Sequence, residues 1–113
     1  NTKDYLKGEI NLRGKIIAVV DLRLRLGMPE RKYDERTCFI VVNVPLNGQG
    51  LSLAVVVDHV EEVIEFDGAN LEAPADFGQS VVSQFIQAVG KAGPKGDEAI
   101  TLLDIDKIVM EGL

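Results

Sequence analysis

The stretch that decides the fold is Gly8-Glu9-Ile10-Asn11-Leu12-Arg13-Gly14-Lys15-Ile16-Ile17-Ala18-Val19-Val20-Asp21-Leu22-Arg23. Before its polar corner at residues 11–14, apolar and polar side chains alternate with a period of two, which is typical of a half-buried strand. After the corner, residues 15–20 are almost wholly apolar and rich in β-branched side chains, which predicts a strand buried on both faces. Gly8 and Gly14 stand where the backbone must bend. Arg13 is the long cation of this corner, and we expect it to point outward, where a partner could reach it.

The composition predicts one compact, mainly β domain. The 113 residues are enough for a single domain over 1–113, and 46% of them are hydrophobic, which supports a real core and disfavours disorder. Aromatic residues make up only 5% and Trp is absent, so the core must consist of Val, Ile, Leu and Ala. This choice of residues favours β structure.

The charge disfavours two kinds of partner. The formal net charge is −6, and the twelve Lys and Arg are scattered rather than clustered. Binding to nucleic acid or to an anionic membrane surface is therefore disfavoured. The sequence also contains no run of the ~20 apolar residues that cross a bilayer. The single cysteine, Cys38, lies in an apolar run, which predicts a buried thiol, excludes an internal disulfide and fits a reducing cytoplasm.

The rest of the chain alternates short strands with turns. We expect strands over residues 37–44, 51–57, 60–66 and 98–103, the first two joined by a turn at 45–50. Residues 21–27 fit either a strand or a short helix capped by Asp21 and ended by Gly27, and we favour the helix. Residues 71–79 read as irregular, and residues 81–89 fit a helix and a strand equally well. A closing helix is expected over residues 104–111, with Asp104 as its N-cap and Gly112 as its end. Many short strands with few helices predict small β-barrels or a sandwich.

Catalytic and ligand-binding patterns are scarce, so we predict no catalytic residue, no cofactor and no metal site. The only histidine, His59, has no neighbouring cysteine in the sequence and reads as a turn or surface residue. A Ser-His-Asp triad is formally possible, but no nucleophile elbow surrounds any serine. The glycines at 48–50 and at Gly90 lack a phosphate-binding pattern. Apolar strands in so small a domain are either closed inside barrels or covered in part by a partner, and we favour a binding module over a small-ligand or hydrolytic domain.

The motifs, taken together, resemble a known family. Residues 8–14, 16–20 and 21–23 closely resemble the CheW-like domain of bacterial chemotaxis. The resemblance continues through residues 36–42, 55–60, 90–91 and 102–108, so it covers nearly the whole chain in order. It implies two SH3-like, five-stranded β-barrels that lie side by side, with short helices.

The resemblance also implies a function. Family members are non-catalytic adaptors that join the cytoplasmic tips of transmembrane chemoreceptors to the histidine kinase CheA, in membrane-associated arrays. One barrel face binds the regulatory domain of CheA, and a groove between the barrels binds the helical hairpin at the receptor tip. An alternative within the family is the CheW-like regulatory domain of a larger chemotaxis protein, either the kinase itself or an adaptor fused to a receiver domain.

Five residues correspond to partner-binding positions of that family. Gly8 and Arg13 match positions implicated in receptor coupling. Cys38 and Phe39 match a strand segment near the same groove. Ala54 stands where family members often have glycine.

The chain departs from the family pattern at its start. Family members usually have about two or three strands before the segment that corresponds to residues 8–14, and here only residues 1–7 precede it. We therefore expect one barrel to be incomplete, either because the chain is N-terminally truncated relative to the family or because a second copy supplies strands in an exchanged homodimer.

Overall fold

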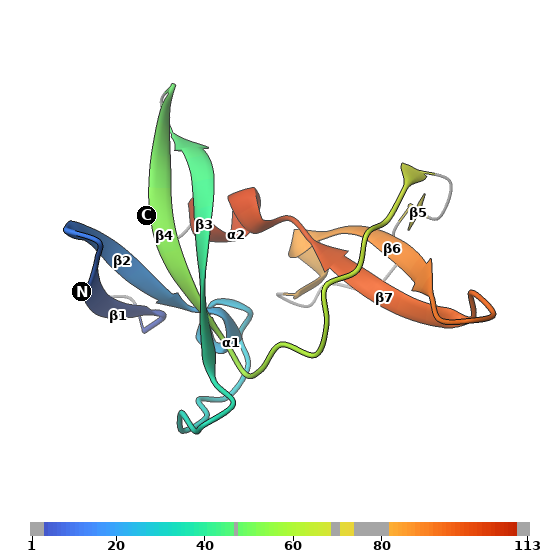
Figure 1. Cartoon of the computed structure of the whole chain (residues 1–113), viewed down its shortest axis with the longest axis horizontal. Coiled ribbons are helices and arrows are strands. Elements are labelled where there is room, and N and C mark those ends of the chain that lie inside the picture. The colour runs from blue at the N-terminus through green and yellow to red at the C-terminus, as the bar shows by residue number, and fades with distance from the viewer. Residues whose placement is uncertain (1–3, 47, 69–70, 74–81, 111–113) are drawn as a thin grey trace.

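The chain folds into two β-sheets joined by an extended segment (Figure 1). The computed structural model describes residues 4–46, 48–68, 71–73 and 82–110. The first sheet contains β1 (Leu6–Leu12), β2 (Lys15–Asp21), β3 (Cys38–Leu46) and β4 (Gln49–Val57). The second contains β5 (Leu71–Glu72), β6 (Ile86–Ala92) and β7 (Glu98–Leu103). The helical elements are α1 (Leu22–Arg25), η2 (Val82–Phe85) and α2 (Ile105–Met110).

The first sheet consists of two hairpins side by side. Its strand order is β1-β2-β4-β3, and β2 pairs with β4 in parallel over four positions, from Ala18 opposite Leu53 to Asp21 opposite Val56. The predicted corner is the turn of the first hairpin, in which Leu12 faces Lys15 across Arg13 and Gly14. Both turn residues have positive φ, 53° and 83°, as the right-handed twist of a two-residue hairpin requires.

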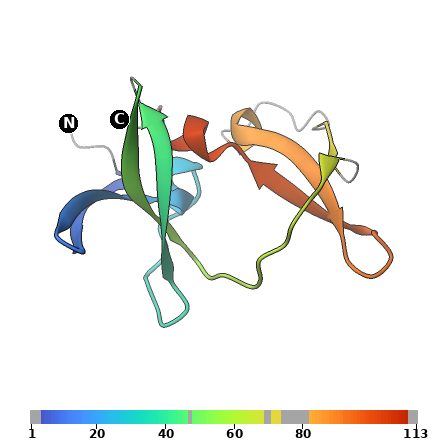
Figure 2. The ribbon, with the colours of Figure 1, turned by 45° about the horizontal axis from the view of Figure 1, so that its top comes forward.

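The main core lies between the first sheet and the C-terminal elements. It contains Leu26, Val44, Leu53, Val55, Phe85, Ile108 and Val109. Phe85 comes from η2 and Ile108 from α2, and both side chains are completely buried. Figures 1 and 2 both show α2 between the two sheets, so this helix joins the halves of the molecule.

The predicted burial of residues 15–20 holds for the second half of that strand. Val19 and Val20 point to opposite faces of β2 and both are buried. Ile16 is 67% exposed, which contradicts the prediction. The reason is the topology: β4 pairs with β2 only from Ala18 onward, so among the described strands β1 alone flanks the first residues of β2.

The two short helices are capped as predicted. The side chain of Asp21 accepts a hydrogen bond from the backbone N–H of Leu24, and Gly27 has a φ of 78° just after α1 ends. The side chain of Asp104 accepts from the backbone N–H of Lys107 at 3.1 Å at the start of α2. The predicted end at Gly112 lies outside the described residues.

The segment between the sheets corrects one prediction. Residues 60–66 were expected to form a strand, yet they pair with no strand of the described part of the chain. Their alternation of apolar and acidic side chains suits a strand, but a strand also needs a partner edge for its backbone groups. Residues 71–79 were expected to be irregular, but they begin with the short strand β5, and residues 74–79 lie outside the described ranges. Residues 81–89 fitted a helix or a strand, and the described part of this stretch contains the helical turn η2 followed by the start of β6.

The fold-class prediction is confirmed. The protein is mainly β with short helices, and its two sheets are consistent with two SH3-like barrels, of which the described residues form four strands and three strands. In the described ranges, the helices are too short to cross a bilayer.

Candidate partner-binding surface

One row of paired residues crosses the whole first sheet. Gly8 lies opposite Val19, Val19 lies opposite Ala54, and Ala54 lies opposite Val41. Two of the predicted site residues, Gly8 and Ala54, therefore share one face of the sheet, two strands apart. Ala54 is completely buried, whereas Val41 at the end of the row is 44% exposed. Ala54 therefore lies beneath this face, and the side chains that a partner could contact belong to the outer strands, such as Val41.

The next row brings Phe39 onto the same face. Phe39 lies opposite Val56, which lies opposite Asp21, and the Phe39 side chain is 46% exposed. Neighbouring Cys38 is half-buried, and its thiol donates to the carbonyl oxygen of Arg36 at 3.2 Å. The prediction of a buried thiol is therefore wrong, because Cys38 begins an outer strand that, among the described strands, pairs with β4 alone.

Arg13 lies far from these residues. Its position at the β1–β2 turn is separated from the row of Phe39 by the length of β2, about 20 Å at the rise of a strand. The side chain is exposed, and it forms no ion pair with any described residue. Arg13 is also the one non-glycine residue with positive φ in the described ranges. Backbone strain of this kind is retained mainly where function or a tight turn requires it.

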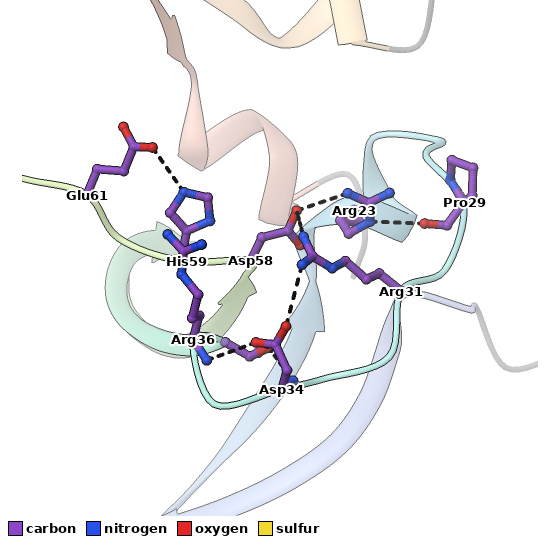
Figure 3. A network of polar contacts seen from close by, with 9 residues as sticks. Arg23, Pro29, Arg31, Asp34, Arg36, Asp58, His59 and Glu61 are labelled. Atoms are coloured by element: carbon purple, nitrogen blue, oxygen red, sulfur yellow. Dashed lines mark hydrogen bonds and ion pairs between the residues drawn. The ribbon is translucent and has the colours of Figure 1, made fainter.

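A polar network anchors the start of β3 (Figure 3). The carboxylate of Asp58 accepts from Arg23 at 2.9 Å and lies 3.4 Å from Arg31. Arg31 also lies 3.4 Å from Asp34. The side chain of Asp34 in turn accepts from the backbone N–H of Arg36 at 2.8 Å. Through these contacts the end of β4 holds the charged loop before β3, and with it the backbone that leads into Cys38 and Phe39.

A buried carboxylate secures the same loop from the other side. Asp21 is 3% exposed, and besides capping α1 it accepts a hydrogen bond from the Tyr33 hydroxyl at 2.8 Å. Burial, and then the bond to Asp21, raise the pKa of Tyr33 to about 12, because both favour the neutral phenol. The sequence gives no hint of this contact, since nothing in the loop pattern marks Tyr33 as a partner of Asp21.

An open groove lies beside Gly8. It has a volume of about 490 Å³ and is lined mainly by apolar side chains, among them Leu6, Ile16, Leu51 and Leu53. The groove forms where the first half of β2 separates from β4, which also explains why Ile16 is exposed. Such a concave apolar surface suits the side chains of a protein partner.

The described residues provide little for chemistry. Within them, no three side chains of the metal-ligating types gather in one place. His59 lies on the segment after β4, and its Nε2 atom lies 3.1 Å from the Oε1 atom of Glu61.

Comparison with known proteins gives a consistent result. The CheW-like domain model matches residues 1–112. The chemotaxis protein CheW of Klebsiella aerogenes is 31% identical over 109 residues, which cover 96% of this chain and 61% of that protein. The chemotaxis protein CheW of Treponema pallidum is 24% identical over 104 residues, covering 92% and 59%. The chain thus spans about three-fifths of the length of these relatives.

The crystal structure of the scaffolding protein TtCheW from Thermoanaerobacter tengcongensis is similar in fold. The TM-score is 0.76 at 30% sequence identity, and the alignment covers 96% of this chain and 68% of the other. A family match over nearly the whole chain and a shared fold lead to one conclusion: the chain belongs to the CheW-like domain family.

Proposed function

We propose that this domain is a non-catalytic adaptor that couples the cytoplasmic tips of chemoreceptors to the regulatory domain of the histidine kinase CheA. The observation that carries the proposal is the family match over residues 1–112, together with a fold shared with a scaffolding protein. In this role the domain works in the cytoplasm, at membrane-associated receptor arrays, and needs no cofactor.

The surface of the first sheet supports this role. An adaptor needs exposed apolar anchors on a rigid frame. Phe39 and Val41 are such anchors, and Ala54 and Val56 form a buried floor beneath them. The network around Asp58 fixes the backbone that leads into Phe39, so this anchor is held in place before a partner arrives.

The five family positions then divide into two contact regions. Phe39 and Cys38 with the supporting Ala54 form one region, and Arg13 at the turn forms the other, with Gly8 beside the groove between them. A helical hairpin that lies along β2 spans the ~20 Å between the regions, because an α-helix of about 13 residues has that length.

A binding assay with two purified partners tests the proposal. Wild-type protein should bind a receptor cytoplasmic fragment and the isolated CheA regulatory domain in calorimetric titrations. Arg13→Ala should weaken receptor binding at least tenfold. Lys15→Ala removes an exposed cation two residues away and should change binding less than twofold. Failure of the wild-type protein to bind either partner would contradict the adaptor function. Equal effects of Arg13→Ala and Lys15→Ala would contradict only the role of Arg13 in receptor binding.

A further inference from the structure

The two outer strands of the first sheet are built differently. At one edge, β1 carries the charged side chains of Lys7 and Glu9 and a register shift next to Gly8. Charges and bulges of this kind prevent an edge from pairing with another strand. At the other edge, β3 has nine residues without a single charged side chain. In the described part of the chain, β4 alone pairs with it.

Exposed apolar side chains lie on both faces of β3. Phe39, Ile40 and Val41 are consecutive in sequence and are 46%, 41% and 44% exposed. Because side chains alternate along a strand, Ile40 points to the face opposite Phe39 and Val41. A helix that docks on one face of the sheet would leave the other face exposed, whereas a strand added at the edge covers side chains on both faces.

Proline shows which backbone groups of β3 are unpaired. Pro45 lies opposite Gly50 in the β3–β4 pair and has no N–H to donate. Proline is tolerated in a strand where the N–H is not needed for pairing, so position 45 is one whose backbone groups face away from β4. Outward-facing positions recur every second residue in an antiparallel pair. The backbone N–H and C=O groups of Phe39, Val41 and Asn43 therefore point to the open edge.

We propose that a second copy of this chain pairs with this edge, β3 against β3, antiparallel about a two-fold axis at Val41. In this register the two Val41 residues lie opposite each other, and each Phe39 lies opposite Asn43 of the second copy. The three outward-facing residues of each strand then form about six backbone hydrogen bonds across the axis. The first sheets of both copies become one continuous sheet.

A second copy fits this edge as the occupant because β3 is uncharged and can pair with itself. The chain carries a net charge of −6, so most contacts between two copies bring like charges together. The uncharged β3 avoids that repulsion, and its exposed apolar residues complement themselves under a two-fold axis. The expected homodimer therefore forms through β3 and not through the bulged and charged β1.

The proposal does not rest on the proposed function, but the two surfaces overlap. Phe39 contributes to both, so a receptor that contacts Phe39 and a second copy of this chain exclude one another. Self-association is measured with the purified chain alone, so it succeeds or fails regardless of whether chemoreceptors bind.

Sedimentation equilibrium over a hundredfold range of protein concentration tests the dimer. Wild-type protein should approach twice the monomer mass, and Val41→Lys, which sets two ammonium groups against each other at the axis, should weaken association at least tenfold. Ile16→Lys is the matched control, because Ile16 is an even more exposed apolar residue away from β3. A wild-type monomer at every concentration would overturn the proposal, and so would an equal effect of both variants.

Cysteine cross-linking tests the register independently of folding effects at the edge. In a Cys38→Ser background, Val41→Cys places two thiols directly opposite, with Cα atoms about 5.5 Å apart, and should give a disulfide-linked dimer on mild oxidation. Asn43→Cys places them about 14 Å apart and should remain monomeric on denaturing gels. Equal cross-linking of both variants, or cross-linking of the Asn43 variant alone, would refute the pairing.

Discussion

The ring of Phe66 lies directly against Gly90, so closely that a Cβ atom on Gly90 would stand 2.5 Å from the Cε1 atom of that ring. Phe66 belongs to the segment that joins the two sheets, and Gly90 belongs to β6. The absence of a side chain at position 90 is thus what lets the segment lie on the second sheet. This contact ties a stretch without strand pairing to a regular element.

Replacing Gly90 with alanine should displace that ring. We expect Gly90→Ala to lower the free energy of unfolding by about 1–3 kcal/mol, the usual cost of overpacking, as measured by urea denaturation. Gly50→Ala is the control, because a Cβ atom on Gly50 would meet nothing within 4 Å. Equal losses in the two variants would show that the ring moves aside without cost.

Arg25 connects the N-terminal and C-terminal parts of the chain. Its Nε donates to the carbonyl oxygen of Ile108 at 2.8 Å, and its guanidinium lies 4.6 Å from the centre of the Phe85 ring and 5.1 Å from that of Tyr5. Arg25→Met keeps much of the aliphatic bulk but loses the hydrogen bond and the cation–π contacts. We expect a loss of about 2 kcal/mol in thermal or chemical unfolding. Lys107→Met, an exposed change on α2, should cost less than about 0.5 kcal/mol, and a comparable loss there would contradict this assignment.

The pair of Tyr33 and Asp21 should make stability fall at high pH. The pKa of Tyr33 is raised in the folded state from its usual 10 to about 12, so the folded protein holds the phenol proton more tightly than the unfolded chain does. The contribution of the neutral Tyr33 phenol to the free energy of unfolding is complete below pH 10 and is lost as the pH rises toward 12. Denaturation midpoints measured across that interval should fall more steeply for wild-type protein than for Tyr33→Phe. Parallel curves would show that the hydroxyl is not held by Asp21.

Arg13 should show a conflict between stability and binding. Because its φ of 53° strains an L-residue other than Asn, Asp or Gly, Arg13→Asn should raise the free energy of unfolding by about 1 kcal/mol. The same variant should bind the receptor fragment more weakly, since it lacks the exposed cation. Lys15→Asn, at a strand position with ordinary geometry, should bring no gain in stability. A stability loss in Arg13→Asn would mean that the arginine itself stabilises the turn.

The local structure could be predicted well from sequence because its causes are local. The corner at residues 11–14 is the turn of the first hairpin, and Asp21 and Asp104 cap the helices that follow them. In each case, the side chain and the backbone group that it satisfies lie within three residues of each other. The mainly β fold follows from the same short-range patterns.

Contacts between distant residues could not be predicted in this way. Arg23 and Asp58 are 35 residues apart and Arg25 and Ile108 are 83 apart, and no spacing in the sequence marks either pair. The predicted strand at residues 60–66 is wrong for a related reason. Its side-chain pattern is local, but the ladder that makes a strand depends on a second segment.

The sequence names candidate site residues but not the surface on which they lie. Family resemblance selects Gly8, Arg13, Cys38, Phe39 and Ala54, and only the strand register reveals that Ala54 is buried and that Arg13 lies a strand's length away from Phe39. The exposure of Ile40 and Val41 was also not evident, because an apolar run looks the same in a central strand and at an edge.

The parallel pairing of β2 with β4 has a consequence for how the protein folds. Each hairpin of the first sheet closes a short loop and can form within microseconds, but their junction brings together Ala18 and Leu53, which are about 35 residues apart. The entropy of closing that loop is lost before the parallel ladder returns any free energy. We therefore expect docking of the two finished hairpins to be the slow step, and substitutions at Val19 and Ala54 should slow refolding more than they speed unfolding. During synthesis, the β1–β2 hairpin emerges from the ribosome before β4 does, so we expect the inner edge of β2 to stay uncovered until β4 is made.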